Sequence, residues 1–142
     1  REVITENTAF LMANLLQGVV DEGTGRRLRF RYGFKNQIGG KTGTTQNHSD
    51  GWFIGITPDL AGGVWVGAED RSIHFQNLSN GQGASMALPI WALFMQKVYA
   101  DKSLAVPQSD FQKPNGVNHV LDCGDADREG MTDYDSSDEI FD

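Results

Sequence analysis

Apolar side chains recur at helical spacing in two parts of the chain. In residues 5–22 they fall at i, i+3, i+4, i+7 and i+8, which predicts an amphipathic helix with Thr5 as its N-cap and Gly23 as its C-cap. Residues 84–100 follow the same period but are apolar on nearly every side, which is typical of a buried helix. Because proline disrupts a helix interior, we expect this helix to begin just before Pro89 or to kink there.

Three short segments between these helices have the apolar content and the boundaries of β-strands. They span residues 37–44, 51–57 and 62–68. Pro58 and Asp59 favour a turn between the second and third segments, and the short connections favour antiparallel pairing. The sequence therefore predicts an α/β (α+β) sandwich, in which a short antiparallel sheet is flanked by the two helices.

The stretches beside these elements are predicted to be irregular. Residues 26–32 interleave four arginines with apolar side chains, which favours a strand or an extended loop with one solvated face. An alternative is that these arginines form a positive rim for an anionic ligand. Residues 69–82 are polar and rich in Gly and Asn, so we expect a loop there.

Acidic charge is concentrated in the last part of the chain. The formal net charge is −7, yet residues 1–115 hold 11 basic and 10 acidic side chains. Residues 116–142 hold one Arg against nine Asp and Glu, and so few apolar groups cannot offset the entropy cost of ordering. We predict a domain portion over residues 1–106 and an acidic flexible tail over residues 107–142. This charge pattern lacks the basic patch of a nucleic-acid-binding protein, so we expect no nucleic-acid partner.

Disulfide, metal and membrane chemistry have little support. Cys123 is the only cysteine, so it cannot form a disulfide within the chain. His48, His74 and His119 lack the spacing of metal ligands, and we expect neither a metal nor a cofactor. The longest apolar run, residues 86–95, is well short of the roughly 20 residues that a membrane-spanning helix needs.

The densest group of reactive side chains is Gly39–Thr45, with the sequence Gly-Gly-Lys-Thr-Gly-Thr-Thr. Its Gly-Lys-Thr resembles the end of a phosphate-binding P-loop. That motif requires another Gly six residues before its Lys, where this chain has Lys35, and a helix after it, where this chain predicts a strand. Two interpretations remain: a polar hairpin without chemistry, or the Lys-Thr-Gly element of serine acyltransferases that act on D-Ala-D-Ala peptides and β-lactams.

The residue types in this stretch suit an anionic peptide substrate. A strand edge can bind an extended peptide as an additional strand. Gly43 removes a side chain where an acyl group must approach, and the hydroxyls of Thr42 and Thr44 can hydrogen-bond a terminal carboxylate. Lys41 supplies positive potential and a partner for proton transfer, and a nearby backbone N–H can stabilise an oxyanion.

The surrounding sequence resembles a known family. The motif is followed by Asp-Gly-Trp-Phe-Ile-Gly-Ile-Thr-Pro-Asp-Leu at 50–60 and by Gly-Val-Trp-Val-Gly at 63–67. This order closely resembles the third catalytic motif region of class A (bifunctional) penicillin-binding proteins. Residues 16–25 look like the helix and turn before that motif, and residues 87–95 look like the C-terminal helix after it. The resemblance covers about residues 3–106, and it implies the serine β-lactamase/penicillin-binding transpeptidase fold.

By this resemblance the parent protein is a peptidoglycan D,D-transpeptidase. In that family a serine attacks the penultimate D-Ala carbonyl of a stem peptide, expels D-Ala and passes the acyl group to an amine on a neighbouring stem. Lys41 then corresponds to the motif lysine and the Thr44 N–H to one oxyanion-hole donor, which makes these two the catalytic residues. The substrate-binding residues are expected to be Thr42, Gly43, Thr44 and Thr45. The implied partners are peptidoglycan stem peptides and β-lactams, at the periplasmic face of the cell membrane.

Two further motifs of that family do not occur in this chain. No serine has Lys three residues later or Asn two residues later, so Ser-x-x-Lys, which contains the nucleophile, and Ser-x-Asn are both missing. The chain also starts at Arg1 without a Met. We therefore expect a fragment that is inactive alone, with the glycosyltransferase domain and the membrane anchor in an N-terminal region outside it. The alternative is a non-catalytic binding module that uses an exposed sheet edge and the acidic tail.

Overall fold

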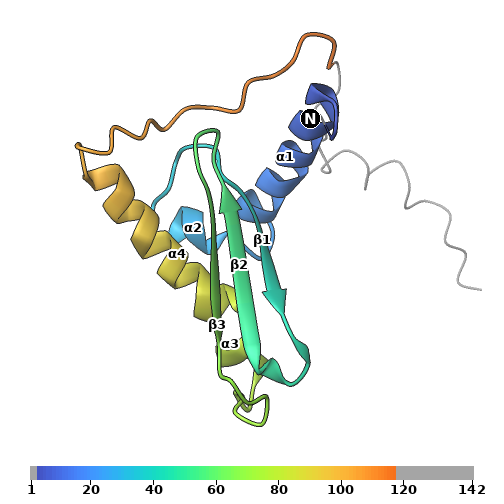
Figure 1. The fold of residues 1–142 in the computed structure, drawn as a ribbon, viewed down its shortest axis with the longest axis vertical. Coiled ribbons are helices and arrows are strands. Elements are labelled where there is room, and N and C mark those ends of the chain that lie inside the picture. The colour runs from blue at the N-terminus through green and yellow to red at the C-terminus, as the bar shows by residue number, and fades with distance from the viewer. Residues whose placement is uncertain (1–2, 118–142) are drawn as a thin grey trace, which may run out of the picture.

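The computed structural model describes residues 3–117, in which the two long helices flank a three-stranded antiparallel sheet of order β1-β2-β3 (Figure 1). The elements are α1 (Glu6–Asp21), α2 (Arg27–Phe30), β1 (Gly39–Thr44), the 3-10 turn η1 (Gln46–His48), β2 (Asp50–Ile56), β3 (Ala61–Gly67), α3 (Leu78–Gly81) and α4 (Gly83–Ala100). The predicted α+β arrangement, its three strands and their antiparallel pairing are confirmed.

One face of the sheet packs on α4. Phe53 in the middle of β2 is fully buried, and its ring centroid lies 5.3 Å from that of Trp91, edge to face. Gly55 follows on the same face, where a Cβ would collide with the Trp91 ring. The Trp91 indole N–H donates to the Gly62 carbonyl at 3.1 Å, so α4 is attached to both β2 and β3. Apolar side chains from α1, α2 and the segment before β1 complete this core: Val20, Leu28, Phe34 and Ile38.

Helix α1 begins as the sequence predicts but ends differently. The Thr8 N–H donates to Thr5 Oγ1 at 3.3 Å, which confirms Thr5 as the N-cap. The prediction of Gly23 as the C-cap is wrong, because the cap residue is Glu22 and Gly23 does not adopt a positive φ. Gly23 is instead required for space, since a Cβ there would lie 2.9 Å from the Cα and the carbonyl oxygen of Val19.

The arginine-rich stretch contains the short helix α2, so the prediction of a strand or extended loop over residues 26–32 is wrong. Arg27 donates to the Ala84 carbonyl at 2.8 Å, which joins α2 to the first turn of α4. Arg29 pairs with Asp21 at 2.7 Å, which joins α2 to the end of α1. Two of the four arginines therefore hold elements together, and the other two are exposed.

Helix α4 is continuous, but it is not buried on all sides. Pro89 lies inside the helix, so the expected start just before it is wrong. Trp91 and the residues in register with it face the core, whereas Ile90, Leu93 and Phe94 are 50%, 54% and 58% exposed. The prediction of a fully buried helix is therefore wrong, because an apolar stripe at i, i+3 and i+4 faces away from the sheet.

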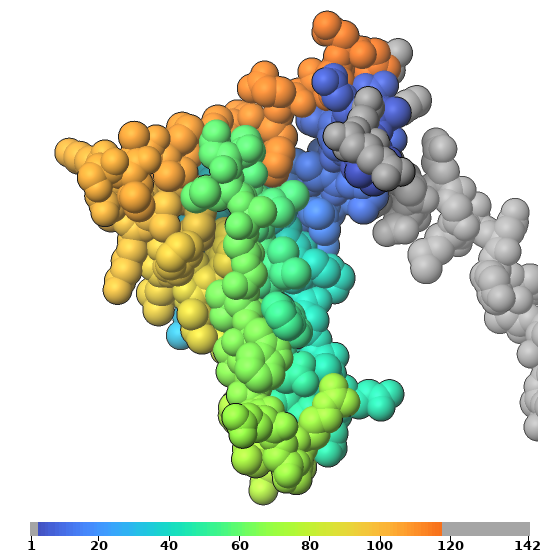
Figure 2. All heavy atoms as spheres, viewed as in Figure 1, coloured from blue at the N-terminus to red at the C-terminus, as the bar shows by residue number. Residues whose placement is uncertain are grey.

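The sheet face opposite α4 is also open. Figure 2 looks onto this side, where the strands lie at the surface. Trp52 and Trp65 are direct cross-strand partners with ring centroids 6.5 Å apart, and both remain close to half exposed. Ile54 lies beside them and is 51% exposed. This side therefore presents apolar surface that nothing in residues 3–117 covers.

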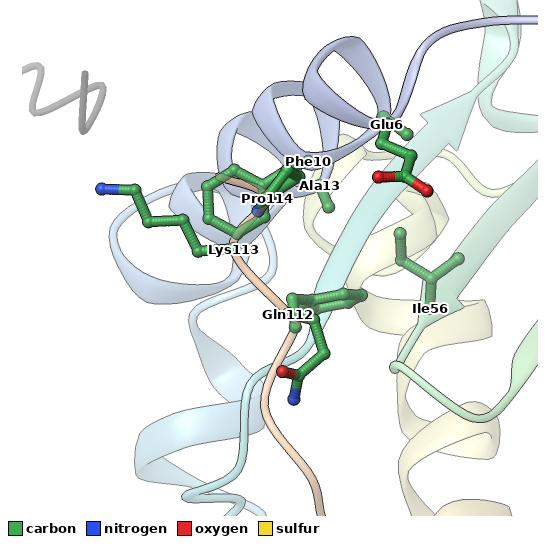
Figure 3. A pocket seen from close by; sticks show the side chains of 9 residues that line it. Glu6, Phe10, Ala13, Ile56, Gln112, Lys113 and Pro114 are labelled. Atoms are coloured by element: carbon green, nitrogen blue, oxygen red, sulfur yellow. The ribbon is translucent and has the colours of Figure 1, made fainter. Parts of the chain in front are cut away.

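The segment after α4 crosses the end of the sheet and returns to α1. Ser109 donates to Asp59 at 2.6 Å, and the Phe111 N–H donates to the Gln37 side chain at 2.8 Å. Residues 111–114 then line an open cavity of about 480 Å³ with the first turns of α1 and the end of β2 (Figure 3). Most of the predicted acidic tail lies outside the described residues, and the predicted domain boundary stays a prediction.

Most of the stretch between β3 and α4 is irregular, as predicted for residues 69–82. The exception is α3, whose Asn80 N–H donates to the side chain of its N-cap Asn77 at 3.0 Å. The connection is therefore a polar loop that ends in a single capped turn next to α4.

Candidate active site

Strand β1 is an edge strand, and alternate residues turn their backbone groups away from the sheet. Just beyond its end, the Thr45 N–H donates to the Asp50 carbonyl at 3.1 Å, which makes these two residues a hydrogen-bonded pair. Bonded and non-bonded pairs alternate along an antiparallel ladder, so the N–H and C=O groups of Thr44 and Thr42 point away from β2. The Thr44 N–H therefore faces the open side of β1, where it can pair with an extended ligand.

The hydroxyls of Thr42 and Thr44 lie on the same face of β1, because alternate strand residues share a face. Thr42 Oγ1 is 2.8 Å from Thr24 Oγ1, in the turn that follows α1. Thr44 Oγ1 accepts a hydrogen bond from the Gly83 N–H at 3.0 Å, so its own proton can still be donated. The edge thus combines an outward N–H with two hydroxyls whose positions are fixed by other elements.

Gly83, the first residue of α4, lies directly on the β1–β2 ladder. A Cβ at this position would collide with the carbonyl oxygens of Gly43 and Trp52. The absence of a side chain lets the α4 N-terminus approach Thr44 closely enough to donate to it. The orientation of the Thr44 hydroxyl therefore depends on the packing of α4.

Lys41 lies on the face of β1 opposite the two threonines, but its side chain reaches the same edge. Its Nζ donates to the outward-pointing Thr42 carbonyl at 2.8 Å. Gly43 is on the Lys41 face, and a Cβ there would lie 3.2 Å from the Trp52 Cβ, a tight contact. The Lys41 ammonium, Gly43 and the outward-facing Thr44 N–H are therefore adjacent along the strand.

Thr45 braces the β1–β2 turn. Its Oγ1 accepts from the Asp50 N–H at 3.2 Å and lies 3.1 Å from Ser49 Oγ. Asn47 and His48 complete the turn in the left-handed region, with φ values of 64° and 55°. The substrate contact expected of Thr45 stays a prediction, because in this structure its hydroxyl is occupied within the turn.

The structure brings four of the predicted residues, Lys41, Thr42, Gly43 and Thr44, to one free edge. Sequence reasoning missed Thr24 and Gly83, the two residues that hold the threonine hydroxyls. Thr24 stands in a Gly-Thr-Gly sequence that indicates a turn, but no spacing rule links it to a strand 18 residues later. Gly83 carries no signal beyond its place before an apolar helix.

Two negative findings apply to the described part of the chain. Within residues 3–117 no three His, Cys, Asp or Glu side chains are grouped so that they could hold a metal ion. Over the same residues, no helix combines the length and the apolar content needed to cross a membrane.

Comparison with protein families identifies the fold around this edge. Residues 1–86 match the family described as "Penicillin binding protein transpeptidase domain". The chain belongs to this family. The β1 edge is therefore part of a penicillin-binding transpeptidase domain, and the expected resemblance is confirmed.

Curated relatives agree with this assignment to the penicillin-binding transpeptidases. The chain is 36% identical over 117 residues to penicillin-binding protein 1A of Pseudomonas aeruginosa, covering 81% of this chain and 13% of the relative. It is 34% identical over 113 residues to penicillin-binding protein 1A of Aquifex aeolicus, covering 80% and 14%. It is 33% identical over 127 residues to penicillin-binding protein 2D of Bacillus subtilis, covering 84% and 17%. The chain thus spans less than a fifth of the length of these relatives.

A solved structure confirms the expected fold. The crystal structure of penicillin-binding protein 1A from Haemophilus influenzae aligns with a TM-score of 0.65 at 30% sequence identity. The alignment covers 80% of this chain and 17% of that one. The sheet and helices described above therefore form part of a larger transpeptidase fold in that protein.

Proposed function

We propose that this chain forms the substrate-holding wall of a peptidoglycan D,D-transpeptidase. The observation that carries the proposal is the free β1 edge, where the outward Thr44 N–H lies beside the hydroxyls of Thr42 and Thr44. An extended stem peptide can pair with this edge, as peptides do with exposed strands. Its C-terminal carboxylate accepts hydrogen bonds from the hydroxyls, and the Lys41 ammonium supplies positive potential beside it.

In the proposed reaction the nucleophile comes from outside this chain. A serine Oγ attacks the carbonyl carbon of the penultimate D-Ala and loses its proton to a base. The carbonyl oxygen becomes an oxyanion, and the Thr44 N–H donates to it. One such donor typically stabilises the transition state by about 2.7–4 kcal/mol. The intermediate collapses as the C–N bond breaks, and D-Ala leaves with the proton taken from the serine. An amine of a second stem then attacks the acyl-enzyme carbonyl, the C–Oγ bond breaks, and the proton lost by the amine returns to the serine oxygen.

The chain alone is proposed to be inactive, because neither Ser-x-x-Lys nor Ser-x-Asn occurs in its sequence. We place these motifs in a preceding part of a longer protein, called the intact protein below. Its catalytic domain is proposed to act on the outer side of the cytoplasmic membrane, with β-lactams as acylating inhibitors. The short span of this chain along its relatives supports the placement of the two missing motifs outside it.

Acylation by a fluorescent penicillin tests the function. We expect the intact protein to become covalently labelled and the 142-residue chain to stay unlabelled under the same conditions. Failure of the intact protein to be labelled would sink the transpeptidase proposal and favour a binding module. Labelling of the isolated chain would contradict its proposed inactivity.

Two substitutions at the edge test the assigned roles in the intact protein. Lys41→Ala removes the cation, and Thr44→Val removes a hydroxyl that donates to a carboxylate. Because hydrogen bonds to charged groups contribute roughly 1.5–3 kcal/mol, each change should slow acylation by about tenfold or more. The rate is measured by stopped-flow or gel-based labelling. Thr8→Val, at the far end of α1, serves as the control and should keep the wild-type rate, and wild-type rates in both edge variants would refute the assignment.

A further inference from the structure

We infer that Thr24, outside the Lys-Thr-Gly stretch, is a specificity-determining residue that makes the site select substrates with a free terminal carboxylate. The inference rests on the proposed function and adds to it a residue from the turn after α1. Its basis is the 2.8 Å contact between the hydroxyl oxygens of Thr24 and Thr42, which joins that turn to the free edge of β1.

The turn that carries Thr24 is held firmly against α1. The Gly23 N–H donates to the Gly18 carbonyl at 3.1 Å, and the Gly25 N–H donates to the Val19 carbonyl at 2.9 Å. The contacts leave no space for side chains at either glycine, since a Cβ on Gly25 would lie 3.1 Å from the same Val19 oxygen. Thr24 is thus the one residue of this Gly-Thr-Gly turn with a side chain, and its backbone is fixed on both sides.

The hydroxyl pair has an unused donor. Each threonine hydroxyl has one proton, and the bond between Thr24 and Thr42 uses one of the two. Whichever residue donates within the pair, the other keeps an O–H for an outside acceptor. Hydrogen bonds in a chain strengthen one another, so the remaining O–H is a better donor than that of a lone threonine. Thr24 therefore both orients and strengthens the donor at the Thr42 position.

A carboxylate is the acceptor that this arrangement favours. The pair lies beside the Thr42 carbonyl, to which the Lys41 ammonium is bound at 2.8 Å, so the local potential is positive. An ionised acceptor gains both from that charge and from a charge-assisted hydrogen bond. A neutral ester or amide at the same place gains much less. Removal of Thr24 should therefore weaken the preference for an acid over its ester.

The test compares a penicillin with its methyl ester in the intact protein. Second-order acylation rate constants are measured for wild type, Thr24→Val, Thr24→Ala and Thr24→Ser. We expect the two variants without a hydroxyl to lower the acid-to-ester rate ratio by about tenfold, mostly through slower reaction of the acid. Thr24→Ser keeps the hydroxyl and should stay within about twofold of wild type.

The matched control is Thr8→Val, which breaks a similar exposed hydroxyl pair, Thr5–Thr8, at 2.9 Å. Thr8 lies in the first turn of α1, roughly 20 Å along the helix from the turn, given a rise of about 1.5 Å per residue. This variant should keep the wild-type ratio. Thermal unfolding of each variant identifies any general loss of structure.

The outcomes separate the two proposals. An unchanged acid-to-ester ratio in Thr24→Val and Thr24→Ala overturns the role of Thr24 while the transpeptidase proposal stands. An equal slowing of acid and ester also overturns it, because that result indicates a structural role only. If wild type is not acylated by either compound, the proposed function itself is wrong and the role of Thr24 falls with it.

Discussion

At the scale of single residues, the site depends on positions where a side chain has no room. Gly83 is the clearest case, since the N–H that holds the Thr44 hydroxyl reaches it only because no Cβ separates α4 from β1 and β2. Gly43 allows a similar close contact with Trp52 on the other face. The sequence suggested Gly43 as a place of close approach, whereas Gly83 precedes a helix and has no such signal.

Gly83→Ala should therefore destabilise the protein and slow acylation. The added methyl group must displace α4 from the Gly43 and Trp52 carbonyls, and such overpacking typically costs about 1–3 kcal/mol. Urea unfolding of the chain measures the stability, and penicillin labelling of the intact protein measures the site. Gly18→Ala is the control, because nothing lies within 4 Å of a Cβ there and the change in mid-helix should stabilise by about 0.5–1 kcal/mol. Equal stabilities of the two variants would contradict the close contact at α4.

At the scale of elements, α4 is joined to the chain before β1 by a partly buried polar contact. The Asn36 side chain donates to the Tyr99 hydroxyl at 3.0 Å, and the Tyr99 ring lies 6.2 Å from that of Phe34. Burial raises the pKa of Tyr99 above its ordinary value, while the hydrogen bond from Asn36 acts in the opposite direction. The neutral phenol is therefore the form that the fold prefers.

The sign of the resulting pH dependence follows from that shift. A raised pKa in the folded state contributes stability that is complete below the ordinary tyrosine pKa of 10.0 and is lost as the pH rises through the folded value. The free energy of unfolding should fall above pH 10, and Tyr99→Phe should show a smaller fall over the same range. Urea titrations between about pH 9 and 11.5 measure both. Parallel pH profiles for wild type and variant would argue against the preference for a neutral phenol.

Element types were predictable from the sequence where the hydrophobic period was strong, as in α1, α4 and the three strands. The hydrophobic pattern did not predict the helix α2, because alternating arginines and apolar residues resemble a half-buried strand. Only Leu28 of that helix is buried, and Arg27 and Arg29 bond to carbonyls that no local pattern reveals. The four residues of the candidate edge, Lys41 to Thr44, were predictable from the motif, whereas the place of Thr24 beside them depends on a tertiary contact.

At the scale of the whole molecule, residues 3–117 expose large apolar side chains in two patches. One patch is the stripe of Ile90, Leu93 and Phe94 on α4, and a second is the sheet face around Trp52 and Trp65. The outer edge of β3 adds unpaired backbone groups, because β3 has a neighbour on one side only. The sequence predicted an open edge, but it could not show which side of α4 lacks a neighbour.

The chain by itself should associate. Sedimentation velocity at increasing protein concentration should show dimers or larger species at micromolar concentration. Leu93→Glu combined with Phe94→Lys should reduce that association, because it places charges on the exposed stripe of α4 and removes nothing from the core. A chain that stays monomeric at all concentrations would show that these patches do not mediate self-association. Association unchanged in the double variant would instead point to the sheet face or to β3.

The bond from Gly83 to Thr44 spans 39 residues of sequence and has a further consequence. Under the proposed function, α4 lies outside the substrate site but orients the Thr44 hydroxyl that binds the substrate. Slight shifts of α4 can arise from changes on its outward stripe or from a partner that packs there. Such shifts can reorient the Thr44 hydroxyl without any change in the residues proposed to contact the substrate. Under the proposed function, substitutions in the first turn of α4 can therefore change β-lactam susceptibility, as substitutions in the motif itself can.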